Sequence, residues 1–358
     1  MDYSGIYQLL SRFSGALCRS LPGNFAPAPL QIYVELTYRC NLACSFCQFR
    51  EVSAQSPGAK LELTSKEFER VLSNLTRGAI VSFSGGEPTL KPGFLDLLTA
   101  VSKRNRTHIF TNGTGIDRVT ARRFVDLGAP TPIHNGLVLV GISFEGLEKT
   151  HNSIVQRSWA FDRTLSGIQT LLEERRRRGK RFPLVEIKAV LTRENLGEIE
   201  KLFQLAKDLG ADLFNPMAMN MMPHLGRIGG FSPSPWDPPP PVEPLPRAEL
   251  QTTLESIFRQ AGPIQVRTTP QGIGPKDFAD YYNGAFRLQD YTCSFPWHGM
   301  TLTAHGDIYI CPYLKVGNIQ EDNWKEARNH QSARAFRKAL GSRGVFPGCL
   351  GCCSLVRR

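Results

Sequence analysis

The sequence predicts an α/β fold in which six strand–helix units curl into a partial barrel, followed by a small cysteine-rich domain. The main observation is a repeated pattern: a short β-branched run ends in a polar or glycine-rich turn and leads into an amphipathic stretch, as is typical of βα units. Right-handed crossovers would curl such units into one curved parallel sheet. Strands are expected near 32–37, 79–84, 107–111, 137–144, 184–191 and 212–217, and helices near 65–76, 93–104, 117–127, 162–178, 194–208 and 247–261.

A second observation is the distribution of prolines and cysteines, which divides the chain. Eight of the fourteen residues from Pro233 to Pro246 are proline, a composition that excludes helix and favours a stiff, extended segment. Five of the nine cysteines follow this segment. We therefore expect an N-terminal amphipathic helix (1–28), the partial barrel (29–230), a proline-rich linker with a connecting helix and strand (231–290) and a C-terminal cysteine-rich domain (291–358).

Composition indicates a globular protein without a membrane span. Hydrophobic residues make up 41% of the chain and charged residues 21%, and no apolar run approaches the roughly 18 residues that a membrane span needs. The first twenty residues lack the basic stretch and continuous apolar core of a signal peptide, so we expect a cytoplasmic location. Apolar residues recur in this leader at helical spacing, which predicts a helix that packs on the body or touches a membrane surface.

Three cysteines, Cys40, Cys44 and Cys47, lie within eight residues just after the first expected strand. Three thiolates can hold three irons of a cubane iron–sulfur cluster, which ordinarily takes four, so one iron would stay open to a substrate or cofactor. Zinc is an alternative, but structural zinc sites close with four ligands and no fourth ligand lies nearby. A disulfide framework is not expected in a chain of 358 residues with ample apolar content for a core.

This loop resembles the signature of radical S-adenosylmethionine (SAM) enzymes, C-x3-C-x2-C with an aromatic residue, here Phe46, before the last cysteine. The resemblance implies that the open iron of a [4Fe–4S] cluster chelates the amino and carboxylate groups of SAM. An electron from that cluster then cleaves SAM to methionine and a 5′-deoxyadenosyl radical. It also implies a (β/α)6 partial barrel, whose chemistry lies at the C-terminal ends of the strands.

Motifs at three further strand ends resemble SAM contacts in this family. Glu87, in a Gly-Gly-Glu-Pro turn, matches the ligand of the SAM amino group, and Asn112, in Thr-Asn-Gly, matches a ribose contact. Ser143 and Glu145 match residues that hydrogen-bond sugar and amino-acid groups, although relatives commonly carry aspartate where this chain has Glu145. Arg157 resembles the arginine that pairs with the SAM carboxylate. Turn formation and surface exposure are the simpler interpretations of these residues.

Four cysteines near the C-terminus are expected to converge. An expected hairpin brings Cys293 and Cys311 together, and the C-x2-C pair Cys349 and Cys352 follows a helix expected near 324–340. From the residues alone, tetrahedral zinc fits this set equally well.

This tail resembles the auxiliary domain called twitch, which is related to SPASM and binds one extra [4Fe–4S] cluster. The resemblance implies that the four cysteines are its ligands. The remaining thiol, Cys353, is then a spare thiol, a replacement ligand or a hydrogen-atom donor to a substrate radical.

The resemblance implies an enzyme in which the deoxyadenosyl radical removes a substrate hydrogen atom and the auxiliary cluster accepts the remaining electron. We expect a redox step on a small molecule in natural-product biosynthesis: dehydrogenation, decarboxylation or epimerisation. Maturation of a ribosomally made precursor peptide is the alternative, and a non-enzymatic electron carrier a third. The formal net charge of +11 favours an anionic substrate and an acidic electron donor such as flavodoxin or ferredoxin. Nucleic acid is not expected, because no known binding module is present.

Overall fold

The computed structural model describes residues 21–50, 62–74, 78–221 and 234–358, and it confirms the expected fold class, a partial barrel of parallel strands covered by helices. The amphipathic helix expected within 1–28 falls largely on residues 1–20, which lie outside the described residues. In the part that is described, Pro22–Asn24 form a short 3-10 helix. None of the helices in the described ranges combines the length and the apolar character that spanning a membrane requires.

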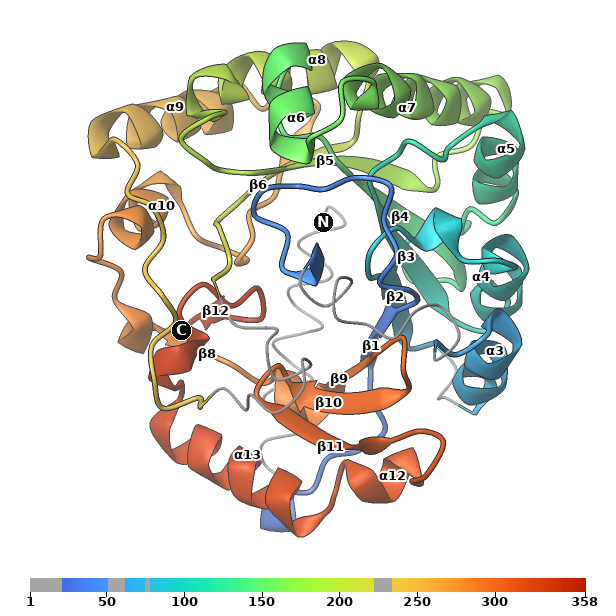
Figure 1. Ribbon diagram of the computed structural model, residues 1–358, viewed down its shortest axis with the longest axis vertical. Helices are drawn as coiled ribbons and strands as arrows, with labels where there is room; N and C mark the ends of the chain where they lie inside the picture. Colours follow the sequence, from blue (N-terminus) through green and yellow to red (C-terminus); the bar gives the residue numbers. More distant parts are fainter. Residues whose placement is uncertain (1–20, 51–61, 75–77, 222–233) are drawn as a thin grey trace.

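One curved sheet forms the centre of the molecule, and its strand order is β11-β10-β9-β1-β2-β3-β4-β5-β6-β7. All neighbours from β1 to β7 are parallel. Figure 1 shows that the sheet is curved and that the helices lie outside it. The seven parallel strands are β1 (Gln31–Glu35), β2 (Ile80–Ser84), β3 (Arg106–Thr111), β4 (Gly136–Ser143), β5 (Leu184–Val190), β6 (Leu213–Met217) and β7 (Gln265–Val266).

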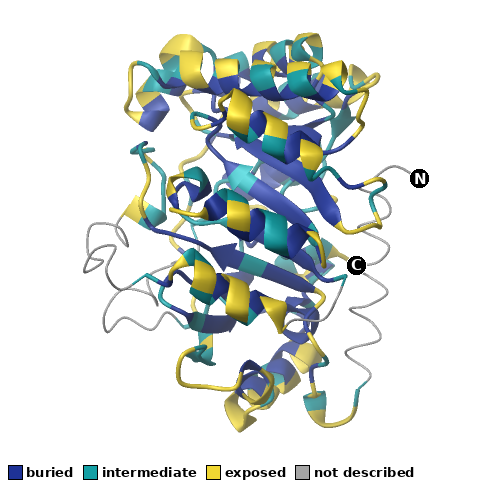
Figure 2. Cartoon of the chain, turned by 90° about the vertical axis from the view of Figure 1, so that its right-hand side faces the viewer, coloured by how far each residue is buried: buried dark blue, intermediate teal, exposed yellow. Residues whose placement is uncertain are grey.

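Helices cover the outer side of this sheet. Figure 2 shows the strands as buried and places the exposed residues on the outer faces of the helices, as amphipathic crossover helices require. The six expected helices are present as α3 (Ser65–Ser73), α4 (Phe94–Ser102), α5 (Arg118–Asp126), α7 (Ala160–Arg177), α8 (Ile199–Leu209) and α9 (Arg247–Arg259).

Two additional helices, α6 (Glu148–Val155) and α10 (Pro275–Tyr282), were not expected from the sequence. Each has only eight residues, too few for the hydrophobic period to stand out. The start of α10 nevertheless has a local signal: Pro275 occupies the first turn, and the Asp277 carboxylate accepts the backbone N–H of Gly274 at 2.8 Å.

The C-terminal region continues the barrel sheet. The strand β9 pairs in parallel with β1, and the expected hairpin is confirmed by the antiparallel pairing of β9 with β10. The helix expected near 324–340 is instead two helices separated by residues 328–330. The elements are β8 (Tyr291–Thr292), α11 (Phe295–His298), β9 (Gly299–Leu302), β10 (Asp307–Cys311), β11 (Leu314–Asn318), α12 (Trp324–Ala327), α13 (Gln331–Arg343) and β12 (Val356–Arg357).

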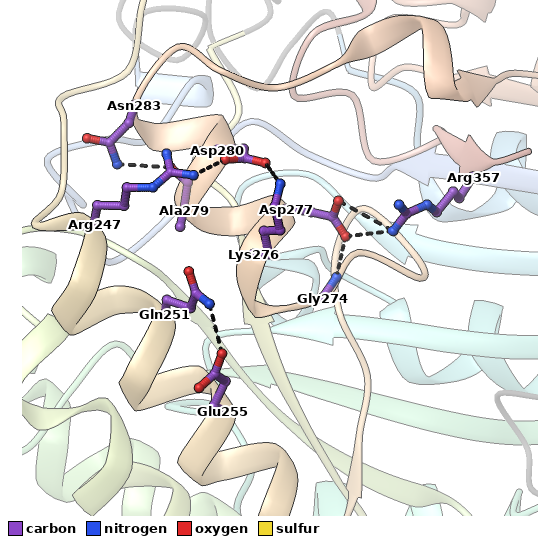
Figure 3. Close-up of polar contacts among 10 residues, drawn as sticks. All are labelled: Arg247, Gln251, Glu255, Gly274, Lys276, Asp277, Ala279, Asp280, Asn283 and Arg357. Carbon is purple, nitrogen blue, oxygen red and sulfur yellow. Dashed lines mark hydrogen bonds and ion pairs between the residues drawn. The ribbon is translucent and has the colours of Figure 1, made fainter.

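Polar contacts around α10 connect the end of the barrel to the C-terminus. Figure 3 shows Asp280 between Arg247 of α9 and Lys276, whose ammonium lies 2.6 Å from the carboxylate. One turn earlier, Asp277 pairs with Arg357 of β12 at 3.0 Å. Because β12 also pairs with β8, the last residues of the chain are held beside the barrel.

The segment before β1 is clamped to α13 by a wholly buried arginine. Arg337 donates to the backbone oxygens of Asn24 (2.7 Å) and Arg328 (2.8 Å) and to the Asn329 side chain (3.1 Å). All three acceptors are neutral oxygens, and no carboxylate among the described residues pairs with the guanidinium. Arg337 stabilises the packing of this segment on α13 because it donates hydrogen bonds to oxygens that would otherwise lack a donor.

We predict that Arg337→Met destabilises the protein by about 2 kcal/mol or more, because buried carbonyls lose their donor. Thermal unfolding of the anaerobically reconstituted protein should show a loss of about 4–6 °C in Tm. Arg334→Met is the matched control: it also removes an arginine of α13 that binds a backbone oxygen, that of Gly23, but its guanidinium is exposed. Equal losses in both variants would contradict the clamp.

Candidate active site

The cysteine loop lies at the C-terminal end of β1 and is held from two sides by backbone hydrogen bonds. On one side, Gly86 N–H donates to the Thr37 oxygen at 2.7 Å and Glu87 N–H to the Arg39 oxygen at 2.8 Å. On the other, Ala43 N–H donates to the oxygen of Val155, at the end of α6, at 3.0 Å. Backbone hydrogen bonds therefore position the loop without a metal.

The two glycines of this contact leave no room for a side chain. A Cβ on Gly86 would lie 2.2 Å from the Arg39 oxygen, and one on Gly85 would lie 2.4 Å from the Thr37 oxygen. Gly85 also has φ of +123°, which disfavours any other residue. Glycine here brings the β2 turn directly onto the cysteine loop.

The three thiols of the loop share one environment. Burial is the main cause that raises the pKa of Cys44, and the nearby Glu145 carboxylate and the other two cysteines raise it further. Burial likewise raises the pKa of Cys40 and Cys47. Without a cation these adjacent thiols would stay protonated, whereas iron would supply the charge that makes them thiolates. This donor set fits a cluster with three protein ligands.

Glu87 is buried and its carboxylate already holds four donors. Oε1 accepts from the Thr89 N–H (3.0 Å), the Thr89 hydroxyl (2.7 Å) and the Thr111 hydroxyl (2.7 Å), and Oε2 accepts from the Asn112 N–H (2.8 Å). The side chain therefore ties the end of β2 to the end of β3. Oε2 has capacity for a further donor, and the expected contact with the SAM amino group stays a prediction.

Asn112 connects the end of β3 to the cysteine loop. Its amide nitrogen donates to the Asn41 side chain at 2.9 Å and lies 3.9 Å from the Cys40 sulfur. The Asn41 amide in turn donates to Thr114 at 2.8 Å. This network could not be expected from the sequence, because Asn41 lies in a turn where asparagine is common. The expected ribose contact of Asn112 stays a prediction.

Glu145 follows β4 and is fixed by its own backbone and by β5. Its N–H donates to Nδ1 of His151 at 3.0 Å, and its Oε2 accepts the Val190 N–H at 2.8 Å. Burial raises the pKa of Glu145 to about 7, and burial lowers the pKa of His151 to about 4, so the imidazole is a neutral acceptor. Ser143, the last residue of β4, stands beside Lys188 of β5.

Arg157 reaches the cysteine loop from the segment between α6 and α7. Its Nε donates to the Asn41 oxygen at 3.2 Å, and its Nη1 to the Gln156 oxygen at 2.8 Å, while the residue stays exposed. The structure therefore places Arg157 near the cluster loop. Its pairing with the SAM carboxylate is a prediction that these contacts leave open.

The four C-terminal cysteines, in contrast, line one small and almost wholly apolar cavity together. Burial raises the pKa of Cys311, and the neighbouring Cys293 and Cys349 act in the same direction. Within the described ranges no three Cys, His, Asp or Glu side chains are close enough to share a single metal ion. Four thiols that line one cavity are the set of donors that an iron–sulfur cubane takes. The other walls are Phe295, Pro296, Ile310, Pro312, Phe336, Leu340, Phe346, Ser354 and Leu355.

Cys353 does not line this cavity, although it adjoins Cys352. It borders a second pocket, which is polar and is shared with Gln31 and Tyr33 of β1. Hydrogen bonds with Cys352 and Ser354 and the nearby Lys188 ammonium lower the pKa of the Cys353 thiol. The structure thus separates Cys353 from the four expected ligands and places it on the barrel side of them.

Two family models match the chain: the Radical SAM superfamily over residues 34–206 and SPASM, an iron–sulfur cluster-binding domain, over residues 293–353. The chain is similar to the AdoMet-dependent heme synthase of Methanosarcina barkeri, with 32% identity over 333 residues, which are 87% of this chain and 84% of that protein. It is 26% identical to the mycofactocin maturase MftC of Mycobacterium tuberculosis over 355 residues, 92% of this chain and 79% of the maturase.

The match to Fe-coproporphyrin III synthase of Methanosarcina barkeri is partial: it has 30% identity but covers only 48% of this chain and 40% of that protein. Among solved structures, SuiB of Streptococcus suis superposes with a TM-score of 0.62 over 93% of this chain and 73% of SuiB, at 19% identity. At that identity the likeness concerns the fold alone.

We predict that Gly86→Ala displaces the cysteine loop, because the new Cβ would collide with the backbone of Arg39. After anaerobic reconstitution the iron content should fall from about eight to about four per chain, with SAM cleavage lost. Gly197→Ala is the control, since a Cβ there meets nothing within 4 Å. Full iron content and SAM cleavage in Gly86→Ala would show that the close contact is dispensable.

We also predict that Arg157→Ala weakens SAM binding about tenfold or more at unchanged iron content, because a charge-assisted contact to the ligand is lost. Equilibrium dialysis with labelled SAM, together with an iron assay, measures both quantities. If iron is lost as well, Arg157 acts through the Asn41 carbonyl; if neither quantity changes, its expected role is wrong.

Proposed function

The chain belongs to the radical SAM superfamily and carries a C-terminal SPASM iron–sulfur cluster-binding domain, and we propose that this enzyme catalyses a redox step on an anionic small molecule. Its cofactors are SAM, a SAM-binding [4Fe–4S] cluster and an auxiliary [4Fe–4S] cluster. When bound, they supply a 5′-deoxyadenosyl radical for hydrogen abstraction and an acceptor for one electron.

In this proposal the residues divide into three sets. Cysteines of the loop after β1 hold the SAM-binding cluster and leave one iron open, polar residues at strand ends hold SAM, and cysteines of the tail hold the auxiliary cluster. The sets are Cys40, Cys44 and Cys47; Glu87, Asn112, Ser143, Glu145 and Arg157; and Cys293, Cys311, Cys349 and Cys352.

The observation that carries the redox assignment is the small apolar cavity with four cysteines in its wall. Four thiolates satisfy all four irons, so no iron would remain to bind a substrate. Electron transfer is then the chemistry left for this cluster. Tyr313 is close to three of the thiols, and burial raises the pKa of its phenol. Its hydroxyl donates to the Gly348 oxygen at 2.7 Å, so the group beside the cysteines is neutral.

The choice of a small molecule is supported by the relatives and by charge. A protein named as a heme synthase is 32% identical over most of the chain, and the net charge of +11 favours anions. An acidic flavodoxin or ferredoxin as electron donor, and a cytoplasmic location, are part of the same proposal.

Maturation of a ribosomally made peptide is the second candidate. It is favoured by the near full-length similarity to a mycofactocin maturase. A gene for a short precursor peptide next to the gene of this protein, with hydrogen abstraction from that peptide by the purified enzyme, would favour maturation over the small-molecule proposal.

Removing the auxiliary cluster should separate hydrogen abstraction from oxidation. We predict that the double variant Cys349→Ala/Cys352→Ala retains about four irons and still forms 5′-deoxyadenosine from SAM with dithionite. Product formation should fall by at least about tenfold, because the substrate radical has lost its electron acceptor. Liquid chromatography with mass detection measures both products in one assay.

Loss of folding is the confounding effect, because a cluster that crosslinks a small domain also stabilises it. Circular dichroism close to that of the unaltered protein is therefore required first. A well-folded double variant that forms product at the unaltered rate would overturn the electron-acceptor role and leave the tail a structural one.

A further inference from the structure

The interior face of β5 carries a lysine, Lys188, close to the residues expected to bind SAM. In the sheet it stands opposite Ser143, and two residues later the N–H of Val190 holds the Glu145 carboxylate at 2.8 Å. Lys188 and Glu145 are close enough that each charge shifts the pKa of the other. The lysine therefore belongs to the part of the barrel interior where a substrate has to meet SAM.

The lysine side chain lies between Gly141 of β4 and the ring of Phe110 of β3. Its Nζ lies 4.1 Å from the centre of the Phe110 ring of β3. Between these strands, β4 has a glycine: a Cβ on Gly141 would lie 2.9 Å from Cδ1 of Phe110, 3.0 Å from Cδ of Lys188 and 3.1 Å from Oε2 of Glu186. Because Gly141 has no side chain, the lysine side chain can pass over β4 toward Phe110. These contacts restrict the positions that its ammonium can take.

The nearby carboxylates have other partners. Glu186 is wholly buried, pairs with Nε of Arg267 at 2.9 Å and accepts from Asn215 at 3.1 Å. Glu145 accepts the Val190 N–H. In the described parts of the chain, Lys188 forms no ion pair within 4 Å and donates no hydrogen bond, and the residue is only partly buried. Its three N–H donors are therefore available to a ligand.

Four charged or titratable groups face the ammonium. The Glu186 and Glu145 carboxylates and the Cys353 thiolate favour its charged form, and Arg267 opposes it. Burial outweighs these effects and lowers the pKa of Lys188. An ammonium in such a site gains most from an anion that brings its own negative charge and acceptor oxygens.

We propose that Lys188 anchors an anionic oxygen group of the substrate, a carboxylate or a phosphate, inside the barrel. This inference rests on the proposed function, and it names the chemical class that the enzyme selects. The cation–π contact with Phe110 orients the ammonium before substrate binds. The anionic group of the substrate then accepts its hydrogen bonds when the substrate binds beside SAM.

The test compares binding of matched probes to the reconstituted, SAM-loaded enzyme and its variants. Equilibrium dialysis uses coproporphyrin III and its tetramethyl ester, benzoate and benzamide, and phenyl phosphate and phenol. Lys188→Met keeps the length of the stem and removes the charge, and Lys188→Arg keeps the charge. Lys207→Met is the matched control, because Lys207 also lies over a phenylalanine, Phe203, at 5.4 Å, but on the outer helix α8.

We expect the enzyme to bind a carboxylate or phosphate probe at least about tenfold more tightly than its neutral counterpart. Lys188→Met should abolish this preference, Lys188→Arg should keep part of it, and Lys207→Met should keep it all. The carboxylate and phosphate arms identify which anion is preferred. Iron content, SAM affinity and substrate-free formation of 5′-deoxyadenosine are measured in every variant, and Lys207→Met should leave all three unchanged.

Three results would overturn the assignment: no anionic preference in the unaltered enzyme, the same preference in Lys188→Met, or a loss of SAM affinity in Lys188→Met, which would place the lysine in the SAM site. The proposed function fails separately. If Lys188→Met abolishes the preference but the identified substrate is a precursor peptide, the lysine binds an acidic group of that peptide and the small-molecule proposal is wrong.

Discussion

The close approach of two glycines to the cysteine loop is the constraint on which the active site depends. Because Gly85 and Gly86 have no side chains, the turn after β2 can donate backbone N–H groups directly to the carbonyls of Thr37 and Arg39. This contact fixes the loop relative to the sheet without any metal. The position of Glu87 follows from it, since the residue after the second glycine is carried into the interior, where its carboxylate binds the end of β3.

The second constraint is the parallel pairing of β9 with β1. Through this ladder the cysteine-rich tail becomes part of the barrel sheet, so the distance between its apolar cavity and the cysteine loop is set by hydrogen bonds rather than by a linker. The pairing of β12 with β8 and the contact of Arg357 with Asp277 close the same unit from the other end. The electron transfer proposed for the auxiliary cluster would depend on such rigidity, because its rate changes with the distance between donor and acceptor.

The sequence predicted the features that depend on local pattern. Parallel strands buried on both faces read as β-branched runs, and the cysteine spacings reveal both sulfur-rich sites. The pairing of β9 with β1 could not be predicted, because the partners are more than 250 residues apart and no local signal connects them. The same holds for the four donors on Glu87 and for Asn41, whose importance arises only where β3 meets the loop. Cys352 lines the apolar cavity and Cys353 lines the polar pocket, and that separation was visible only with the tail in place.

Charged residues occupy alternate positions of β5, at Glu186 and Lys188. A strand of a parallel sheet with helices outside is normally apolar on both faces, and a buried charge there is costly unless it is paired. Glu186 meets that condition through Arg267 and Asn215. Lys188, two residues further toward the SAM-binding end, has the Phe110 ring instead. Folding alone gives no reason for a charge at that position, since a methionine would fill the same slot with less desolvation. The more economical explanation is that the missing partner of Lys188 arrives with the substrate.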